Sequence, residues 1–126
     1  DIVTVHCPKT KETAGMFDAA RIARMKPGAR LINTARGGIV DEAALHAALA
    51  SGKLGGAGID VFSPEPPLTD NPLFTLKNVI VAPHMAGNSR ESLDRKALTV
   101  VRNLLSVLDG APRTEYVVNP EALRPR

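Results

Sequence analysis

Apolar residues along the chain alternate between short β-branched runs and stretches with helical spacing. We expect strands over residues 2–6, 29–34, 57–62 and 79–82, which are apolar runs bounded by proline, glycine or polar residues. We expect helices over residues 19–25, 42–51 and 89–108, where apolar side chains recur every three or four positions. Apolar runs without strict alternation are typical of parallel strands that are covered on both faces. The pattern therefore predicts an α/β fold, with the strands in half of a doubly wound parallel sheet.

The predicted helices begin at residues that can cap a helix N-terminus. Asp18 and Asp41 precede the first two helices, and their carboxylates can accept hydrogen bonds from free backbone N–H groups. Asn88, together with Glu91, gives the long third helix a start that resembles a capping box. We expect residues 113–126, which follow that helix, to be irregular.

Composition narrows the classes of protein that the chain can represent. Its 126 residues are 44% hydrophobic and 23% charged, as in ordinary globular domains. The net charge is only +3, and the basic residues do not cluster, which argues against a nucleic-acid partner. The single cysteine, Cys7, excludes an internal disulfide framework and a cysteine-rich metal site. No apolar stretch approaches about 18 residues and no segment resembles a signal peptide, so we expect a cytoplasmic protein without a membrane partner.

The candidate chemistry follows the predicted strands, at the edge where open parallel sheets bind ligands. Arg36 comes after the second strand, Asp60 and Glu65 after the third, and His84 after the fourth. A guanidinium can hold a carboxylate through two hydrogen bonds, and an imidazole can exchange a proton near neutral pH. Together these groups suit the reduction of a 2-keto acid by hydride transfer. Taken singly, each has a simpler interpretation as a surface or helix-capping residue. The shared position favours function, and His46 lacks such support.

Four segments of the chain carry a resemblance to a known family. They read HCPKTKETAGMF (residues 6–17), MKPGARLINTARGGIVDEAAL (25–45), GKLGGAGIDVFSPEPP (52–67) and NVIVAPHMAG (78–87). They resemble the D-isomer-specific 2-hydroxyacid dehydrogenases, which include phosphoglycerate dehydrogenase, hydroxypyruvate reductase and D-lactate dehydrogenase. The resemblance implies that residues 1–87 are the C-terminal half of a Rossmann-type dinucleotide-binding domain. It also implies that residues 88–126 hold a long return helix and a tail toward the substrate domain.

The resemblance implies a role for each candidate site residue. Arg36 would bind the substrate carboxylate, Glu65 would pair with the acid/base His84, and Asp60 would contact the nicotinamide end of the cofactor. The dinucleotide site would be lined, largely through backbone atoms, by Cys7, Thr34, Ala35, Arg36, His84, Met85, Ala86 and Gly87. No metal is implied.

The implied activity is that of an NAD(P)-dependent oxidoreductase that interconverts a D-2-hydroxy acid and its 2-keto acid. We expect NAD, or alternatively NADP, as the cofactor and a homodimer of the full-length enzyme. The chain opens at Asp1 directly in a strand, and it lacks both the family's Gly-x-Gly-x-x-Gly turn and the acidic residue that selects NAD. We therefore expect a fragment that is inactive alone.

Two other interpretations remain open. One is a non-catalytic, dinucleotide-sensing binding protein of the corepressor type, and the other is an inactive truncated remnant. Glu65 argues against a formate dehydrogenase, because that enzyme resembles the family but carries glutamine at this position.

Overall fold

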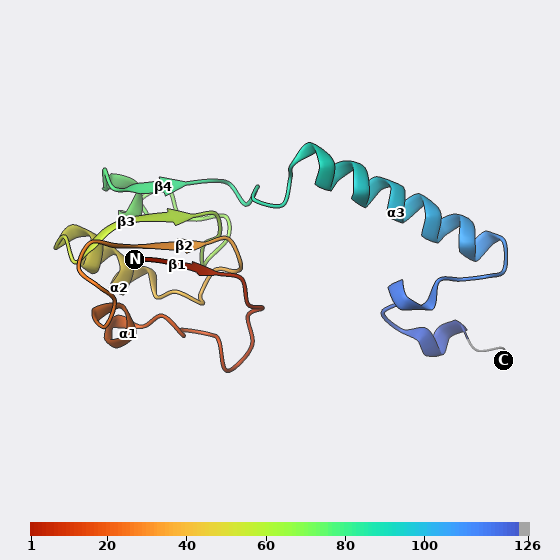
Figure 1. Cartoon of the computed structure of the whole chain (residues 1–126), viewed down its shortest axis with the longest axis horizontal. Coiled ribbons are helices and arrows are strands. Elements are labelled where there is room, and N and C mark those ends of the chain that lie inside the picture. Colours follow the sequence, from red (N-terminus) through yellow and green to blue (C-terminus); the bar gives the residue numbers. More distant parts are fainter. Residues whose placement is uncertain (124–126) are drawn as a thin grey trace. The chain divides into compact units, whose positions relative to one another are not determined.

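The four expected strands form one parallel sheet in the computed structural model, which describes residues 1–123 (Figure 1). The strands are β1 (Ile2–Val5), β2 (Ala29–Asn33), β3 (Leu54–Ile59) and β4 (Val79–Val81); the α-helices are α1 (Ala19–Ala23), α2 (Glu42–Ala50) and α3 (Arg90–Leu108); the 3₁₀ helices are η1 (Pro72–Thr75), η2 (Thr114–Tyr116) and η3 (Pro120–Leu123). The order in the sheet is β1-β2-β3-β4, and every neighbouring pair is parallel. The predicted α/β fold with a parallel sheet is confirmed.

The boundaries of β3 differ most from the prediction, because the strand begins and ends three residues earlier than residues 57–62. Gly55 and Gly56, which resemble loop residues in the sequence, lie inside the strand. A Cβ atom on Gly55 would lie 2.5 Å from the carbonyl oxygen of Gly28, so a side chain has no room there. These glycines therefore belong to a strand that a neighbouring segment approaches closely.

The helix caps were predicted correctly for α1 and α2 and wrongly for α3. The carboxylates of Asp18 and Asp41 each accept a hydrogen bond from the backbone N–H three residues later, at 2.8 and 3.0 Å. In α3 the capping residue is Ser89 rather than Asn88, and its hydroxyl accepts a hydrogen bond from the backbone N–H of Ser92 at 3.2 Å. A serine is as good a cap as an asparagine, so the sequence pattern alone did not discriminate between the two adjacent positions.

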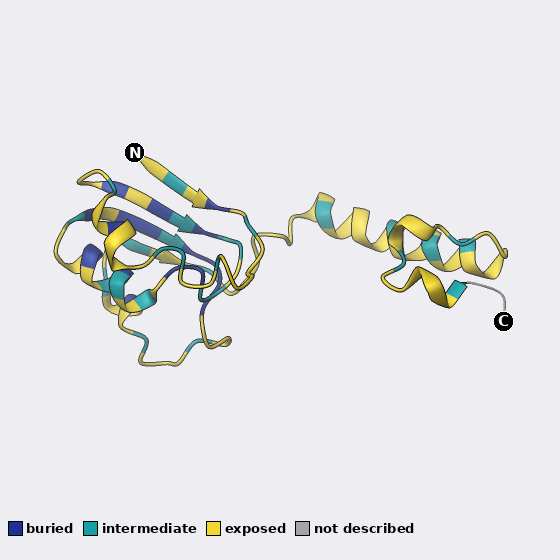
Figure 2. Ribbon diagram, turned by 90° about the horizontal axis from the view of Figure 1, so that it is seen from below, coloured by how far each residue is buried: buried dark blue, intermediate teal, exposed yellow. Residues whose placement is uncertain are grey.

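One apolar core joins a single face of the sheet to α1, α2 and η1. Its most deeply buried side chains, each at most 2% exposed, include Ile22, Leu31, Ile39, Leu45, Leu54 and Leu73. Figure 2 shows the buried positions concentrated in the sheet and in the elements packed against it. The core therefore fixes the strands whose ends carry the candidate site.

The opposite face of the sheet is exposed within residues 1–86, contrary to the expectation of coverage on both faces. Ile2 is 62% exposed and Ile80 is 78% exposed. The reason lies in the topology, since right-handed crossovers between strands that advance in one direction place all connecting elements on the same face. The elements of residues 1–86 therefore cover one face only.

The chain divides into two units, Asp1–Ala86 and Gly87–Arg126. The second unit contains α3, which has no buried residue among those described, followed by η2 and η3. The tail was expected to be irregular, but it forms these two short 3₁₀ helices, and the guanidinium of Arg113 lies 4.9 Å from the centre of the Tyr116 ring. Residues 124–126 of the expected tail lie outside the described residues. No helix within residues 1–123 is long and apolar enough to cross a membrane.

Candidate functional site

A buried asparagine holds the loop that follows β2. Asn33 is 2% exposed; its side-chain nitrogen donates to the carbonyl oxygen of Arg36 at 3.0 Å, and its side-chain oxygen accepts from the backbone N–H of Ala35 at 3.1 Å. Because the Asn33 side chain is buried, its two hydrogen bonds hold the backbone of Ala35 and Arg36 in place. The sequence analysis missed Asn33. Its signal is a polar side chain at the last position of an apolar strand, where burial demands hydrogen-bond partners.

Arg36 is exposed at the tip of this loop, and its Nη1 donates to the carbonyl oxygen of Ala35 at 2.7 Å. The next residue must be glycine, because a Cβ atom on Gly37 would lie 1.7 Å from the carbonyl oxygen of Phe62. This contact brings the loops after β2 and β3 together. An open cleft of ≈ 580 Å³ borders the arginine and is lined by His6, Cys7, Pro8, Lys9, Thr34, Ala35 and Arg36.

Asp60, directly after β3, is a buried carboxylate with 4% exposure. Its two side-chain oxygens accept hydrogen bonds from the backbone N–H groups of Met85 and Ala86, both at 2.8 Å. Its carbonyl oxygen also accepts from the backbone N–H of His84 at 2.9 Å. Three hydrogen bonds to one residue therefore hold the turn after β4, in which His84 has the unusual φ of 56°.

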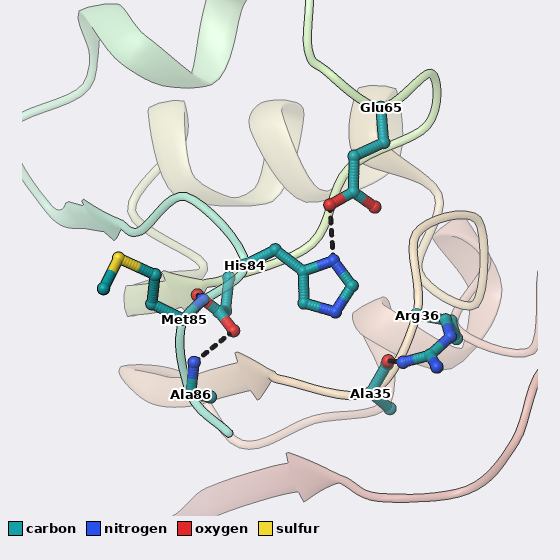
Figure 3. A network of polar contacts seen from close by, with 7 residues as sticks. Ala35, Arg36, Glu65, His84, Met85 and Ala86 are labelled. Atoms are coloured by element: carbon teal, nitrogen blue, oxygen red, sulfur yellow. Dashed lines mark hydrogen bonds and ion pairs between the residues drawn. The ribbon is translucent and has the colours of Figure 1, made fainter. Parts of the chain in front are cut away.

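Glu65 and His84 face each other from the loops after β3 and β4 (Figure 3). Glu65 Oε1 lies 2.5 Å from His84 Nδ1, and the side chains are 38% and 43% exposed. His84 Nε2 makes no hydrogen bond with residues 1–123 and is the ring nitrogen left for a ligand. The pair lies on a cleft of ≈ 480 Å³ lined by Asp60, Phe62, Glu65, Pro66, Pro67, Phe74, Val81, Ala82, Pro83 and His84.

The remaining predicted site residues divide between the two units. Cys7 is half-buried and packs against the core, while Met85 and Ala86 line a third cleft of ≈ 330 Å³ with Thr34 and Asp60. Gly87 belongs to the second unit, where its carbonyl oxygen accepts from Lys96 Nζ at 2.9 Å. All predicted site residues except Gly87 therefore lie in the first unit.

The site combines a hydrogen-bonded histidine and glutamate, a guanidinium and two open clefts. Within residues 1–123, no three His, Cys, Asp or Glu side chains are grouped so that they could hold a metal ion. The clefts lie along the carboxyl ends of β2, β3 and β4, where open α/β sheets bind their ligands. The third cleft is bordered mainly by apolar side chains and by the backbone of Met85 and Ala86, which Asp60 holds.

Comparison with known proteins gives a consistent assignment. Residues 1–86 match the family model described as D-isomer specific 2-hydroxyacid dehydrogenase, NAD binding domain. The chain is 41% identical over 125 residues to a D-3-phosphoglycerate dehydrogenase of Archaeoglobus fulgidus, and the match covers 99% of this chain and 24% of that protein. It is 44% identical over 126 residues to a glyoxylate reductase of Thermofilum pendens, and this match covers 100% of this chain and 37% of that protein.

A solved structure is also similar to this chain. The crystal structure of the TT0316 protein from Thermus thermophilus is similar with a TM-score of 0.83 and 45% sequence identity, over 89% of this chain and 36% of that one. The chain thus spans between 24% and 37% of the length of these three proteins.

Proposed function

Because the chain belongs to the D-isomer specific 2-hydroxyacid dehydrogenase family, we propose that the full-length protein is an NAD-dependent oxidoreductase that interconverts a 2-hydroxy acid and its 2-keto acid. The family membership confirms the resemblance of the four sequence segments. The observation that carries the proposal is the hydrogen bond of 2.5 Å between Glu65 and His84, on the sheet edge that also bears Arg36. A histidine oriented by a carboxylate is well suited to transfer a proton to a carbonyl oxygen.

His84 is the proposed acid/base. Thr34, Asp60, Met85 and Ala86 would line the site of bound NAD, which would supply the hydride chemistry at the carbon that carries the hydroxyl or carbonyl group. His84 Nε2 gives a proton to the carbonyl oxygen during reduction and takes it from the hydroxyl during oxidation. Glu65 contacts Nδ1, so it fixes the orientation of the ring and stabilises the positive charge on the imidazolium.

Arg36 is the proposed carboxylate-binding residue. One of its guanidinium N–H groups is bonded to the carbonyl oxygen of Ala35, and the others remain for a substrate. A bidentate grip on the carboxylate places the carbonyl group of the keto acid at a set distance from His84. Asn33 supports this geometry by holding the backbone of the loop after β2, and Asp60 does so by holding the backbone of the turn after β4.

We propose a small 2-hydroxy acid as the substrate, the class to which the names of the relatives from Archaeoglobus fulgidus and Thermofilum pendens point. We propose the cytoplasm as the location of the protein. We also propose that the full-length protein forms a homodimer, and sedimentation velocity would test this assembly. We propose neither a nucleic-acid nor a membrane partner.

The test is turnover of the full-length protein with NADH and a panel of 2-keto acids. His84→Ala is expected to lower kcat by about 10²–10⁴-fold, the usual contribution of general acid–base catalysis. The matched control is His46→Ala, because His46 is a half-buried histidine on α2 that lines neither the cleft of Glu65 and His84 nor the cleft of Arg36. Full kcat in the His84 variant would refute the assignment. NAD binding by the wild-type protein without turnover of any 2-keto acid would favour the corepressor-type binding protein.

A further inference from the structure

One side chain of α2 holds both ends of the loop that carries Glu65. Glu42, the first residue of α2, accepts a hydrogen bond from the backbone N–H of Ser63 through Oε1 at 2.7 Å. Through Oε2 it accepts a second from the side-chain amide of Asn71 at 2.8 Å. Ser63 and Asn71 lie on either side of Glu65 in the chain, so a single carboxylate closes the loop between them.

The loop has few other polar attachments. Within residues 1–123, residues 64–70 make two hydrogen bonds to residues outside that range. One is the bond between Glu65 and His84, and the other runs from the backbone N–H of Asn71 to the carbonyl oxygen of Leu68 at 3.1 Å. Asn71 is itself anchored, because its side-chain oxygen accepts from the backbone N–H of Leu73, which is 1% exposed in the core. The position of Glu65 therefore depends on the two ends of the loop, and both ends are bonded to Glu42.

Glu42 lies on a rigid support. The preceding residue, Asp41, caps α2 through the backbone N–H of Ala44 at 3.0 Å, and Leu45 in the first turn is completely buried. A carboxylate on such a helix can hold a loop in place, because its own position is fixed by the core. No feature of the sequence analysis pointed to Glu42.

From this geometry we infer that Glu42 is a positioning residue for the Glu65–His84 pair, acting through the loop of residues 63–71. This inference rests on the proposed function of that pair. A glutamate in the first turn of a helix also stabilises the helix through its dipole. That role alone would change the stability of α2 and leave the ionisation behaviour of the site unaltered.

The experiment compares Glu42→Ala and Glu42→Gln with Asp41→Ala and Glu65→Gln in the full-length protein. Asp41→Ala is the matched control, because it weakens the same end of α2 without removing a bond to the loop. Glu42→Ala leaves two donors without their acceptor, and we expect kcat to fall by about 10- to 100-fold, as misplacement of a catalytic group does. Its pH–rate profile should move in the same direction as that of Glu65→Gln. Glu42→Gln keeps an oxygen that can accept the hydrogen bond from Ser63. Its kcat should therefore lie between those of wild type and Glu42→Ala.

A second measurement does not depend on turnover. The Nδ1 proton resonance of His84, in protein labelled at histidine, reports its hydrogen bond with Glu65. We expect this resonance to shift or broaden in Glu42→Ala and, less strongly, in Glu42→Gln, but not in Asp41→Ala. An unchanged resonance in both Glu42 variants would overturn the inference. Wild-type protein that shows the resonance but turns over no 2-keto acid would instead overturn the proposed function, and the variants would still decide the role of Glu42.

Discussion

The two units of the chain use similar apolar side chains in opposite ways. In Asp1–Ala86, leucines and isoleucines from the sheet and two helices are buried together, with Leu31, Leu45 and Leu54 completely inaccessible. In Gly87–Arg126, α3 has a stripe of leucines and valines at helical spacing, yet Leu104 is 58% exposed and Leu108 is 72% exposed. Apolar periodicity therefore predicts where a helix forms, but not what that helix packs against.

The same contrast applies to chemistry. The polar side chains of the candidate site, those of Arg36, Asp60, Glu65 and His84 among them, lie in the first unit, where the core holds the strand ends in place. The second unit contributes only Gly87 to the residues predicted from the sequence. The polar side chains of the site are thus held by strands that are themselves anchored in the apolar core.

The largest expected effect tests the contrast in packing directly. Leu31→Ala leaves a cavity beneath β2, and we expect the free energy of unfolding to fall by about 2–5 kcal/mol. Leu104→Ala removes a side chain that is mostly in contact with water, and its effect should stay within about 0.5 kcal/mol. Urea unfolding of both variants of the chain measures the difference. A cost for Leu104→Ala as large as that for Leu31→Ala would break the comparison, because it would show that the stripe on α3 is covered in solution.

The sequence predicted the elements of both units well and their packing less well. The capping carboxylates of Asp18 and Asp41 and the apolar runs of the four strands are local signals, and the structure confirms them. The start of β3 was placed too late, because Gly55 is explained only by the approach of Gly28, a residue distant in sequence. The exposed face of the sheet likewise follows from the topology and not from the composition of any strand.

The next largest effect concerns binding of the substrate carboxylate. It tests whether only residues of the first unit bind that group. Under the proposed function, Arg36→Lys should raise KM for the keto acid by about 10- to 100-fold in the full-length protein, because an ammonium cannot reproduce a planar two-point grip. Arg102→Lys, at an exposed position of α3, is the matched control and should leave KM unchanged. Steady-state kinetics of both variants provide the measurement. Equal KM values for wild type and Arg36→Lys would remove Arg36 from carboxylate binding.

The candidate site was predictable where a reactive side chain follows a strand, and unpredictable where a side chain acts through backbone. Arg36, Glu65 and His84 each follow a strand, and the structure places Glu65 against His84. Asn33 and Glu42 were missed, because their partners are backbone groups and an amide that become neighbours only in the folded chain. Asp60 was named as a contact of the cofactor, which stays a prediction, and its two backbone partners in the turn after β4 were not foreseen.

The smallest expected effect concerns the pKa values of exposed carboxylates. These should respond to local hydrogen bonds in the same way in both units. At the start of α3, the backbone N–H of Glu91 itself and the hydroxyl of Ser89 lower the pKa of the Glu91 carboxyl below its ordinary value. In the first unit, the hydroxyl of Thr10 is the main group that lowers the pKa of Glu12. Both shifts come from neighbours in the chain and require no core, so burial should not affect them.

Ser89→Ala is expected to raise the pKa of Glu91 toward its ordinary value, because the variant lacks the hydroxyl that lowers this pKa and that also caps α3. A carboxylate whose pKa is lower in the folded chain stabilises the fold above its ordinary pKa, and this contribution disappears as the pH falls through the lowered value. The variant should therefore lose less α3 helicity than wild type on acidification. Carboxyl carbon NMR titration measures both glutamates in one sample, with Glu12 as the internal control. A Glu91 titration unchanged by Ser89→Ala, with Glu12 also unchanged, would show that the Ser89 hydroxyl does not act on this carboxylate.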